Sequence, residues 1–257
     1  MSLHQMKGLS LKAASDVGGP LYSIEDMQHR NSIFDQFQNK LLGKRVLGMY
    51  LFPGSRNRCL VPLSDGHIVD CYLASGGPVK YYSKYSSGYA CAESITFNPF
   101  VPDIFLVGWS DGSVSFFTDA SLFSLRTFEP EHFFDNNIIN SQVGSKVEWS
   151  RYNPTVFFVS CNHCIVTLDL KQDDLDLYWK LYDPKNATCA DLANANSSCN
   201  FAITSTSDLN QNSRILAANE AGIMVRKLPK SLNLSNCEGD IKKRISFLKH
   251  YANNVIG

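Results

Sequence analysis

The sequence predicts an all-β fold, a WD40-type β-propeller of which about four blades are present as a partial ring, with a C-terminal amphipathic helix. Three observations predict it: a Ser-Asp-Gly turn that occurs twice between short apolar runs, an ungapped self-match at an offset of 52 residues, and turns that recur every 46 to 58 residues. Propeller blades of this type have four strands and repeat every ~40–45 residues, and loop insertions lengthen individual blades. A β-sandwich is the alternative, but an ungapped internal repeat is not a general property of sandwiches.

The first two blades are predicted from their central hairpins. The segments Arg58–Cys71 and Ile104–Phe117 both place Ser-Asp-Gly between two short apolar strands. Asp-Gly supplies the positive φ angles of a tight type I′ turn. An aspartate in such a turn can accept hydrogen bonds from nearby backbone amides, so we interpret Asp65 and Asp111 as turn residues and not as a pair of catalytic carboxylates.

The third and fourth blades are weaker copies. The third matches the second without a gap, through the pairs Phe97 and Trp149, Pro102 and Pro154, Phe105 and Phe157, Val107 and Val159, and Val114 and Val166. Its turn is Asn162-His163-Cys164, which keeps the apolar frame but loses the Asp-Gly chemistry. The fourth copy is Arg214–Leu228, with Gly222 in its turn.

Each hairpin is expected to have further strands beside it. First strands are predicted at Val46–Phe52, Ser94–Phe97, Lys146–Trp149 and Asn200–Ser205, and fourth strands at Ser124–Phe128 and Leu177–Tyr182. We therefore expect an N-terminal segment at 1–43 with a candidate blade remnant and a helix, WD-type blades at 44–230, and the C-terminal helix at 231–257. Four blades do not close a ring, and unpaired sheet edges favour association. The rest of the ring is thus expected in sequence outside these residues, or a partner is expected to cover the edges.

The predicted C-terminal helix is amphipathic. Its apolar stripe consists of Ile241, Ile245, Leu248, Ala252 and Val255, and the residues that face the opposite way are Lys242, Lys243, Lys249 and Asn253. The stripe either packs against the chain's own blades, which we favour, or lies in a groove of a partner protein. For the second interpretation, the candidate partner-binding residues are Arg244, Phe247 and Tyr251.

Composition and motifs favour a binding module over an enzyme. Of the 257 residues 44% are hydrophobic, and 24 Lys and Arg balance 24 Asp and Glu. A protein that neutralises nucleic-acid phosphates normally carries a basic excess, and no segment approaches the ~18 apolar residues of a membrane span. We therefore expect neither nucleic acid nor a membrane as a partner. The sequence has no phosphate-binding loop, serine-nucleophile elbow or zinc-protease motif, so we predict no enzymatic activity and no catalytic, metal or cofactor site.

The cysteines and tryptophans are expected to have structural roles. Cys161-Asn-His-Cys164 has metal-ligand residue types, but a structural zinc needs further ligands. The segment also coincides with a hairpin turn, and we interpret it as one. The eight cysteines are expected to be free and mostly buried, as is typical of a reducing compartment such as the cytoplasm. Trp109, Trp149 and Trp179 are expected to fill the packing between blades.

Two segments resemble dynein intermediate chains, a family of WD-repeat proteins. They are Phe97–Val114, which runs from an aromatic residue through prolines and an apolar strand to Ser-Asp-Gly, and Val147–Val159, which repeats the aromatic residue, the proline and the strand. Thr167-Leu-Asp-Leu170 stands where the family has Trp-Asp-Leu, so the signature tryptophan is lost. Over roughly residues 10–250, the order of features is most similar to the intermediate chains of cytoplasmic dynein-2, the motor of retrograde intraflagellar transport.

This resemblance implies a non-catalytic scaffold subunit of a motor complex. Its propeller would bind the dynein-2 heavy chain and assemble with other dynein-2 subunits, in the cytoplasm, on the cytoskeleton and at the ciliary base, and would support cilium assembly. Family members bind light chains through an N-terminal extension that these residues do not match, so the resemblance does not extend to light-chain binding. The alternatives are an axonemal dynein intermediate chain or another WD-repeat adaptor and, more remotely, a propeller hydrolase with acids on its inner strands.

Overall fold

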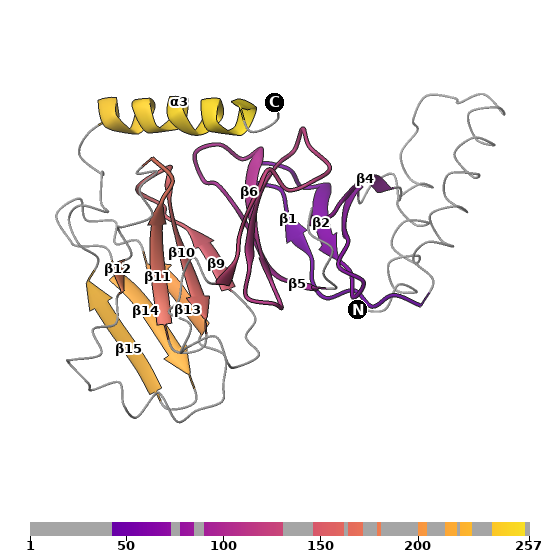
Figure 1. The fold of residues 1–257 in the computed structure, drawn as a ribbon, viewed down its shortest axis with the longest axis horizontal. Coiled ribbons are helices and arrows are strands. Elements are labelled where there is room, and N and C mark those ends of the chain that lie inside the picture. The colour runs from indigo at the N-terminus through magenta and orange to yellow at the C-terminus, as the bar shows by residue number, and fades with distance from the viewer. Residues whose placement is uncertain are drawn as a thin grey trace.

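The computed structural model describes residues 43–72, 78–84, 90–130, 146–161, 164–171, 179–180, 200–204, 214–219, 222–227 and 238–254. Within these ranges the chain is mostly β. It forms four small antiparallel sheets, three of four strands and one of three, none of which is closed on itself, and one helix near the C-terminus (Figure 1). No helix in the described ranges is long and apolar enough to cross a membrane. The expected segment at 1–43 lies outside the described residues, apart from Gly43.

Every sheet is a meander, because its strands lie side by side in the order in which they follow in the chain. Sheet I contains β1 (Tyr50–Leu51), β2 (Arg58–Pro62), β3 (Ile68–Tyr72) and β4 (Pro78–Tyr82). Sheet II contains β5 (Ala92–Phe97), β6 (Ile104–Trp109), β7 (Val114–Thr118) and β8 (Arg126–Phe128). Sheet III contains β9 (Lys146–Trp149), β10 (Val156–Cys161), β11 (Cys164–Asp169) and β12 (Trp179–Lys180). Sheet IV contains β13 (Asn200–Thr204), β14 (Arg214–Asn219) and β15 (Gly222–Lys227), and the helix α3 spans Glu238–Asn254.

Most of the predicted strands are present. The expected first strands correspond to β1, β5, β9 and β13, and the expected fourth strands correspond to β8 and β12. The four expected hairpins are β2–β3, β6–β7, β10–β11 and β14–β15. The prediction that Gly222 lies in the fourth turn is wrong, because Gly222 pairs with Asn219 as the first residue of β15. The strand β4 is not among the predicted ones, and it begins at a proline. Proline is tolerated at the first residue of a strand or on a sheet edge, and Pro78 meets both conditions.

The Ser-Asp-Gly turns differ from the predicted type I′ turn. In the first turn the Leu63 N–H donates to the His67 carbonyl at 2.8 Å, and the Leu63 carbonyl accepts the Gly66 N–H at 3.2 Å. Leu63 and His67 thus form the last pair of the ladder, and three residues connect the strands. Gly66 has a φ of +84°, the left-handed conformation that completes a three-residue hairpin loop. In the second turn the Trp109 N–H donates to the Ser113 carbonyl and the Gly112 N–H donates to the Trp109 carbonyl, both at 3.0 Å. The prediction of a type I′ turn is wrong because the serine belongs to the loop as well.

The repeat at an offset of 52 residues also appears in the hydrogen bonds between backbone N–H groups and the side chains of Asn98 and Ser150. In sheet II the side-chain oxygen of Asn98 accepts the backbone N–H groups two and three residues on, at 2.9 and 3.0 Å. In sheet III the hydroxyl of Ser150 does the same, at 3.2 Å for both bonds. The Asn98 amide also donates to the Pro154 carbonyl at 2.8 Å. The loop between the first and second strands is thus built alike in both sheets and joins them.

After the hairpin turn the repeat shifts by one residue. Gly108 pairs with Val114 in sheet II, whereas Ser160 pairs with Ile165 in sheet III. The loop of sheet III is one residue shorter, so the structural equivalent of Val114 is Ile165. The predicted match of Val114 with Val166 is therefore wrong.

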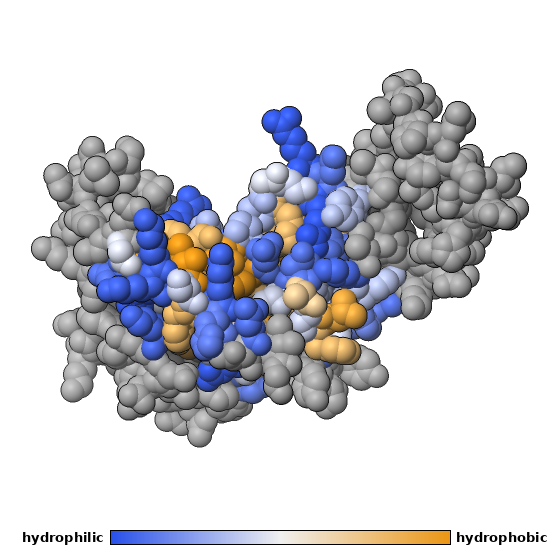
Figure 2. Space-filling view, turned by 90° about the horizontal axis from the view of Figure 1, so that it is seen from above, coloured by the Kyte–Doolittle hydropathy of each residue, from blue (hydrophilic) through white to orange (hydrophobic). Residues whose placement is uncertain are grey.

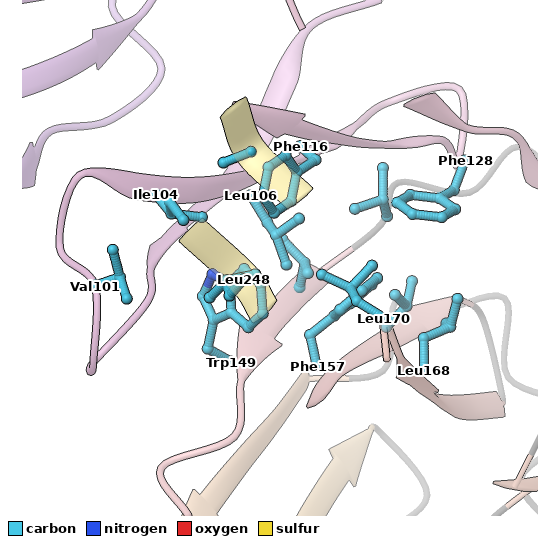
Figure 3. Close-up of a cluster of buried hydrophobic side chains, with 14 residues drawn as sticks. Val101, Ile104, Leu106, Phe116, Phe128, Trp149, Phe157, Leu168, Leu170 and Leu248 are labelled. Carbon is cyan, nitrogen blue, oxygen red and sulfur yellow. The ribbon is translucent and has the colours of Figure 1, made fainter. Parts of the chain in front are cut away.

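Sheet II lies between sheets I and III, and both of its faces are buried (Figure 1). Every residue of β6 and β7 is buried. Burial on both faces explains why β6 reads as a continuous apolar run without alternation. The cluster between sheets I and II consists of Phe52, Leu60, Ile68, Tyr82, Ala90, Ala92, Ile95, Phe105, Val107, Trp109 and Phe117. On the other face, side chains of sheets II and III converge in a second cluster, which contains Trp149 (Figure 3). Trp109 and Trp149 thus fill packing between sheets, as predicted, and the side chain of Trp179 lies outside the described residues.

The first strands of successive sheets lie side by side. The strand β5 contacts β9, and β9 contacts β13. The Ser94 hydroxyl in β5 accepts the backbone N–H of Val147 in β9 at 3.0 Å. On the other side of β5, the Tyr50 hydroxyl of β1 donates to the Glu93 carbonyl at 3.2 Å. The first strands of sheets II, III and IV are therefore adjacent in chain order, and a side-chain hydrogen bond links β1 to β5.

Candidate functional site

The candidate binding element predicted from the sequence, the helix α3, lies across sheets II and III (Figure 1). Leu248 is fully buried, Ala252 is 3% exposed, and Ile245 packs against the same cluster. Figure 3 shows Leu248 among side chains from both sheets. The apolar stripe thus packs against the chain's own sheets, which is the interpretation that the sequence favours. Val255, the last residue of the stripe, lies outside the described residues.

Arg244 anchors α3 to sheet III. Its Nη1 donates to Asp169 Oδ2 and to the Thr155 hydroxyl, both at 2.6 Å, and that hydroxyl donates in turn to Asp169 Oδ1. The side chains of Arg244 and Asp169 are only 14% and 12% exposed. Removing one partner of such a pair is costly, because the other charge would stay in a dry environment without its counterion.

Tyr251 and Phe247 lie on the same side of the helix and contact sheet II. The Tyr251 hydroxyl accepts a hydrogen bond from Arg126 Nη1 of β8 at 2.7 Å. Its ring meets Phe116 edge-on, with centroids 5.6 Å apart, and stacks on Phe247 at 6.0 Å. The three candidate partner-binding residues therefore lie together on the docked side of α3. Their binding to a partner stays a prediction.

The opposite side of α3 faces solvent, as predicted. Its exposed residues include Lys242, Lys243, Lys249 and Asn253. Lys243 lies 3.8 Å from the Asp240 carboxylate one turn earlier. Such an exposed pair within a helix contributes only about 0.3–0.5 kcal/mol to stability. This side of α3 is therefore a solvated helix face.

A cluster of charged side chains, which is not among the predicted sites, joins sheets I and II. The Arg58 guanidinium of β2 binds the fully buried Asp70 carboxylate at 2.6 and 3.0 Å, and it binds Asp119, just after β7, at 2.9 Å. Asp119 also accepts hydrogen bonds from Lys80 Nζ at 3.0 Å and from the Tyr82 hydroxyl at 2.8 Å. We call these five residues the Arg58 cluster. It ties three strands of sheet I to the end of β7.

The Arg58 cluster surrounds the Asp119 carboxylate with hydrogen-bond donors from Arg58, Lys80 and Tyr82. The hydrogen bonds from Arg58, with those from Lys80 and Tyr82, keep the pKa of Asp119 well below its usual range, although partial burial acts in the opposite direction. Burial raises the pKa of Tyr82, and the neighbouring Asp119 carboxylate raises it further. A carboxylate with so low a pKa is a poor general base near neutral pH. One residue in the sequence could have indicated this cluster. Asp70 is an acid within an otherwise apolar strand, and a buried charge requires a partner.

The serines of the Ser-Asp-Gly turns hold the chain that leads into the first strand of the same sheet. The Ser64 hydroxyl accepts the Arg45 N–H at 3.0 Å, and the Ser64 N–H donates to the Arg45 carbonyl at 2.9 Å. Ser110 and Cys91 form the same two bonds in sheet II, at 2.9 and 2.8 Å. The repeated serine therefore has a repeated structural role.

The aspartates of these turns accept backbone N–H groups two residues on, at 3.2 and 3.0 Å, as predicted. Each also binds a lysine that the sequence analysis does not identify: Asp65 binds Lys44, and Asp111 binds Lys84 at 2.6 Å. Partial burial acts to raise the pKa of Asp111, but Lys84 and Ser113 outweigh it and the pKa is lowered. The two aspartates lie in separate turns and bind separate lysines.

The described cysteines are free, but not all are buried. Cys59 is fully buried, whereas Cys71 and Cys91 are partly exposed. Cys161 and Cys164 are paired residues that end β10 and begin β11, so Cys164 belongs to a strand and not to the turn that the sequence predicts at Asn162-His163-Cys164. Residues 162 and 163 lie outside the described residues. Among the residues that the structure describes, no three His, Cys, Asp or Glu side chains are grouped as metal ligands would be.

A row of exposed apolar side chains lies at the edge of sheet I. Leu47, Met49 and Leu51 alternate along the chain at β1 and are 44 to 51% exposed. Leu51 lies in β1 and pairs with Cys59, and Leu47 and Met49 lie in the chain that leads into this strand. Seen from above, the described surface is mostly hydrophilic with separate apolar areas (Figure 2). Apolar side chains on an edge strand are a typical site of association.

Comparison with protein-family models and with curated proteins finds no match to this chain. The resemblance to dynein intermediate chains therefore stays a prediction from the residues that carry it.

Proposed function

We propose that this chain is a non-catalytic, protein-binding scaffold built from WD40-type propeller blades that form part of a ring. The observation that carries the proposal is the succession of meander sheets whose faces pack on one another and whose first strands lie side by side. Successive blades of a propeller are arranged in this way. In a β-sandwich two sheets share one core between their inner faces, whereas sheet II contributes to a separate core on each face.

The polar side chains support a scaffold over a propeller hydrolase. The aspartates at the turns and sheet junctions each bind a lysine or an arginine of the chain, and they are Asp65, Asp111, Asp119 and Asp169. These carboxylates neutralise cations and accept backbone or hydroxyl hydrogens, which stabilises the fold. A hydrolase would instead need acids directed at a substrate.

The proposed partner is the dynein-2 heavy chain, and the proposed process is intraflagellar transport and cilium assembly. The support is the resemblance of Phe97–Val114 and Val147–Val159 to dynein intermediate chains. Each of these segments covers the equivalent part of a sheet, the link from the first strand to the second. The exposed row of Leu47, Met49 and Leu51 offers apolar surface for association.

Co-precipitation from ciliated cells tests this proposal. The chain carries an affinity tag, and mass spectrometry quantifies the heavy chains recovered with it. We expect the dynein-2 heavy chain with the wild type and with Lys171→Asp, an exposed position. We expect a strong loss with Phe105→Asp, because an unpaired charge would be buried between sheets I and II. Recovery of no dynein heavy chain contradicts the proposal, and recovery of an axonemal heavy chain selects the axonemal alternative.

A further inference from the structure

Sheet I brings two cysteines opposite each other on neighbouring strands. Cys59 of β2 and Cys71 of β3 are partners in the antiparallel register, which runs without a bulge from Arg58 to Pro62. Both are free thiols. Residues directly opposite in an antiparallel pair project from the same face of the sheet, so the two thiols lie next to each other.

The spacing of this pair suits a disulfide. Hydrogen-bonded and non-hydrogen-bonded pairs alternate along an antiparallel ladder, and the Leu63 N–H donates to the His67 carbonyl. Cys59 and Cys71 lie four residues from this pair along each strand, so they also form a hydrogen-bonded pair, with Cα atoms about 5.5 Å apart. Disulfides join Cα atoms about 4.4–6.8 Å apart. Their Cβ atoms, about 5.5 Å apart in a hydrogen-bonded pair, must approach by about 1–2 Å.

We propose that Cys59 and Cys71 form a dithiol that a disulfide oxidant, such as oxidised glutathione, converts reversibly into a cross-strand disulfide between β2 and β3. This modification goes beyond the scaffold function and does not depend on it. The small approach that the strands must make stores strain in the bond, and strained disulfides are more easily reduced than relaxed ones.

The partial exposure of Cys71 sets the order of the steps, because Cys59 is fully buried. The Cys71 thiol loses its proton to solvent, and the thiolate attacks one sulfur of oxidised glutathione. A mixed disulfide forms, and one glutathione leaves as a thiolate. Cys59 then loses its proton and attacks the Cys71 sulfur, which releases the second glutathione. Two protein thiols are oxidised, and one oxidised glutathione is reduced to two thiols.

The environment makes the first step slow at neutral pH. Burial raises the pKa of Cys71 to about 12, with smaller contributions from Cys59 and Asp70. The thiolate is the reactive form, and well below the pKa its fraction rises tenfold with each pH unit. The oxidation rate should therefore rise about tenfold from pH 7.5 to pH 8.5.

Peptide mass spectrometry of the native chain tests the proposal. The reduced full-length chain is incubated with oxidised glutathione, free thiols are alkylated, and the chain is digested with trypsin. The tryptic peptide 59–80 contains Cys59 and Cys71 and no other cysteine, while Cys161 and Cys164 fall in the separate peptide 152–171. We expect peptide 59–80 to lose two hydrogen atoms and both alkylation sites, and to regain both sites after reduction.

Cys91 provides the control for the oxidant, since it is partly exposed and lies in the peptide 85–126. It should acquire glutathione under the same conditions. The variant Cys71→Ser should keep one alkylatable thiol in peptide 59–80, because the buried Cys59 then has no partner. The proposal is overturned if Cys91 is modified while native peptide 59–80 keeps two free thiols. It is also overturned if the bond forms only in denaturant.

Discussion

Single residues in this chain act mainly by joining sheets that are distant in sequence. Arg58 of sheet I binds Asp119 of sheet II, and Arg244 of α3 binds Asp169 of sheet III. Both pairs are partly desolvated and have additional hydrogen-bond donors around the acid. Such pairs contribute little net stability compared with apolar packing, but losing one member is costly. They therefore specify which surfaces meet, and the apolar clusters provide most of the free energy.

The residue scale also shows what sequence can and cannot predict. The roles of Asp65 and Asp111 in their turns were predictable, because the bonds to backbone N–H groups depend only on neighbouring residues. Their lysine partners Lys44 and Lys84 were not, because the lysines precede the aspartates by 21 and 27 residues and only the packed sheet brings them together. The Arg58 cluster was missed for the same reason.

A substitution at Gly66 tests the turn geometry. Gly66 has a φ of +84°, and a Cβ there would lie 2.7 Å from the Ala90 carbonyl oxygen, a backbone atom that cannot swing aside. Gly54 has a φ of +77° with open space around it. Gly54→Ala should lower the free energy of unfolding by about 1–2 kcal/mol, because alanine disfavours the left-handed conformation. Gly66→Ala should lower it by an additional amount of about 1–3 kcal/mol, because the new Cβ overlaps the Ala90 carbonyl oxygen.

Urea unfolding of the two variants and the wild type measures this difference in the free energy of unfolding. Gly54→Ala is the matched control, because both glycines share the left-handed conformation and only Gly66 has a close neighbour. Equal losses for the two variants would show that the turn does not pack against the segment before β5.

At the scale of elements, strands were easier to predict than their connections. Apolar runs bounded by turn residues located β9 without error and the other first strands to within a few residues, because a strand is recognised from its own side chains. The hairpin loops were predicted with the wrong length, since a two-residue and a three-residue loop share the same Asp-Gly. The amphipathic stripe identified α3 as a helix, but not where it docks.

The docking of α3 can be tested with two neighbouring residues. Leu248 is fully buried against sheets II and III, and Lys249 is exposed. Leu248→Ala should lower the free energy of unfolding by about 2–5 kcal/mol and make the helix more susceptible to trypsin. Lys249→Ala should change it by less than about 0.5 kcal/mol. If Leu248→Ala alters neither stability nor proteolysis, the helix is not held on the sheets in solution.

At the scale of the whole molecule, the central feature is the position of sheet II. Its two faces contribute to separate apolar clusters, one shared with sheet I and one with sheet III and α3. The internal repeat predicted that the units are alike, and the continuous apolar run of β6 is consistent with burial on both faces. The sequence alone could not say which units touch, because that depends on long-range packing.

Hydrogen exchange of the native full-length chain tests this arrangement most directly. Amides exchange most slowly where strands are covered and fully paired, and fastest at exposed edges. The account predicts that amides of β6 and β7 exchange more slowly than those of β1 and β4, the edge strands of sheet I. It would be contradicted by exchange in β6 and β7 that is as fast as in β1 and β4, because sheet II would then not lie between two neighbours.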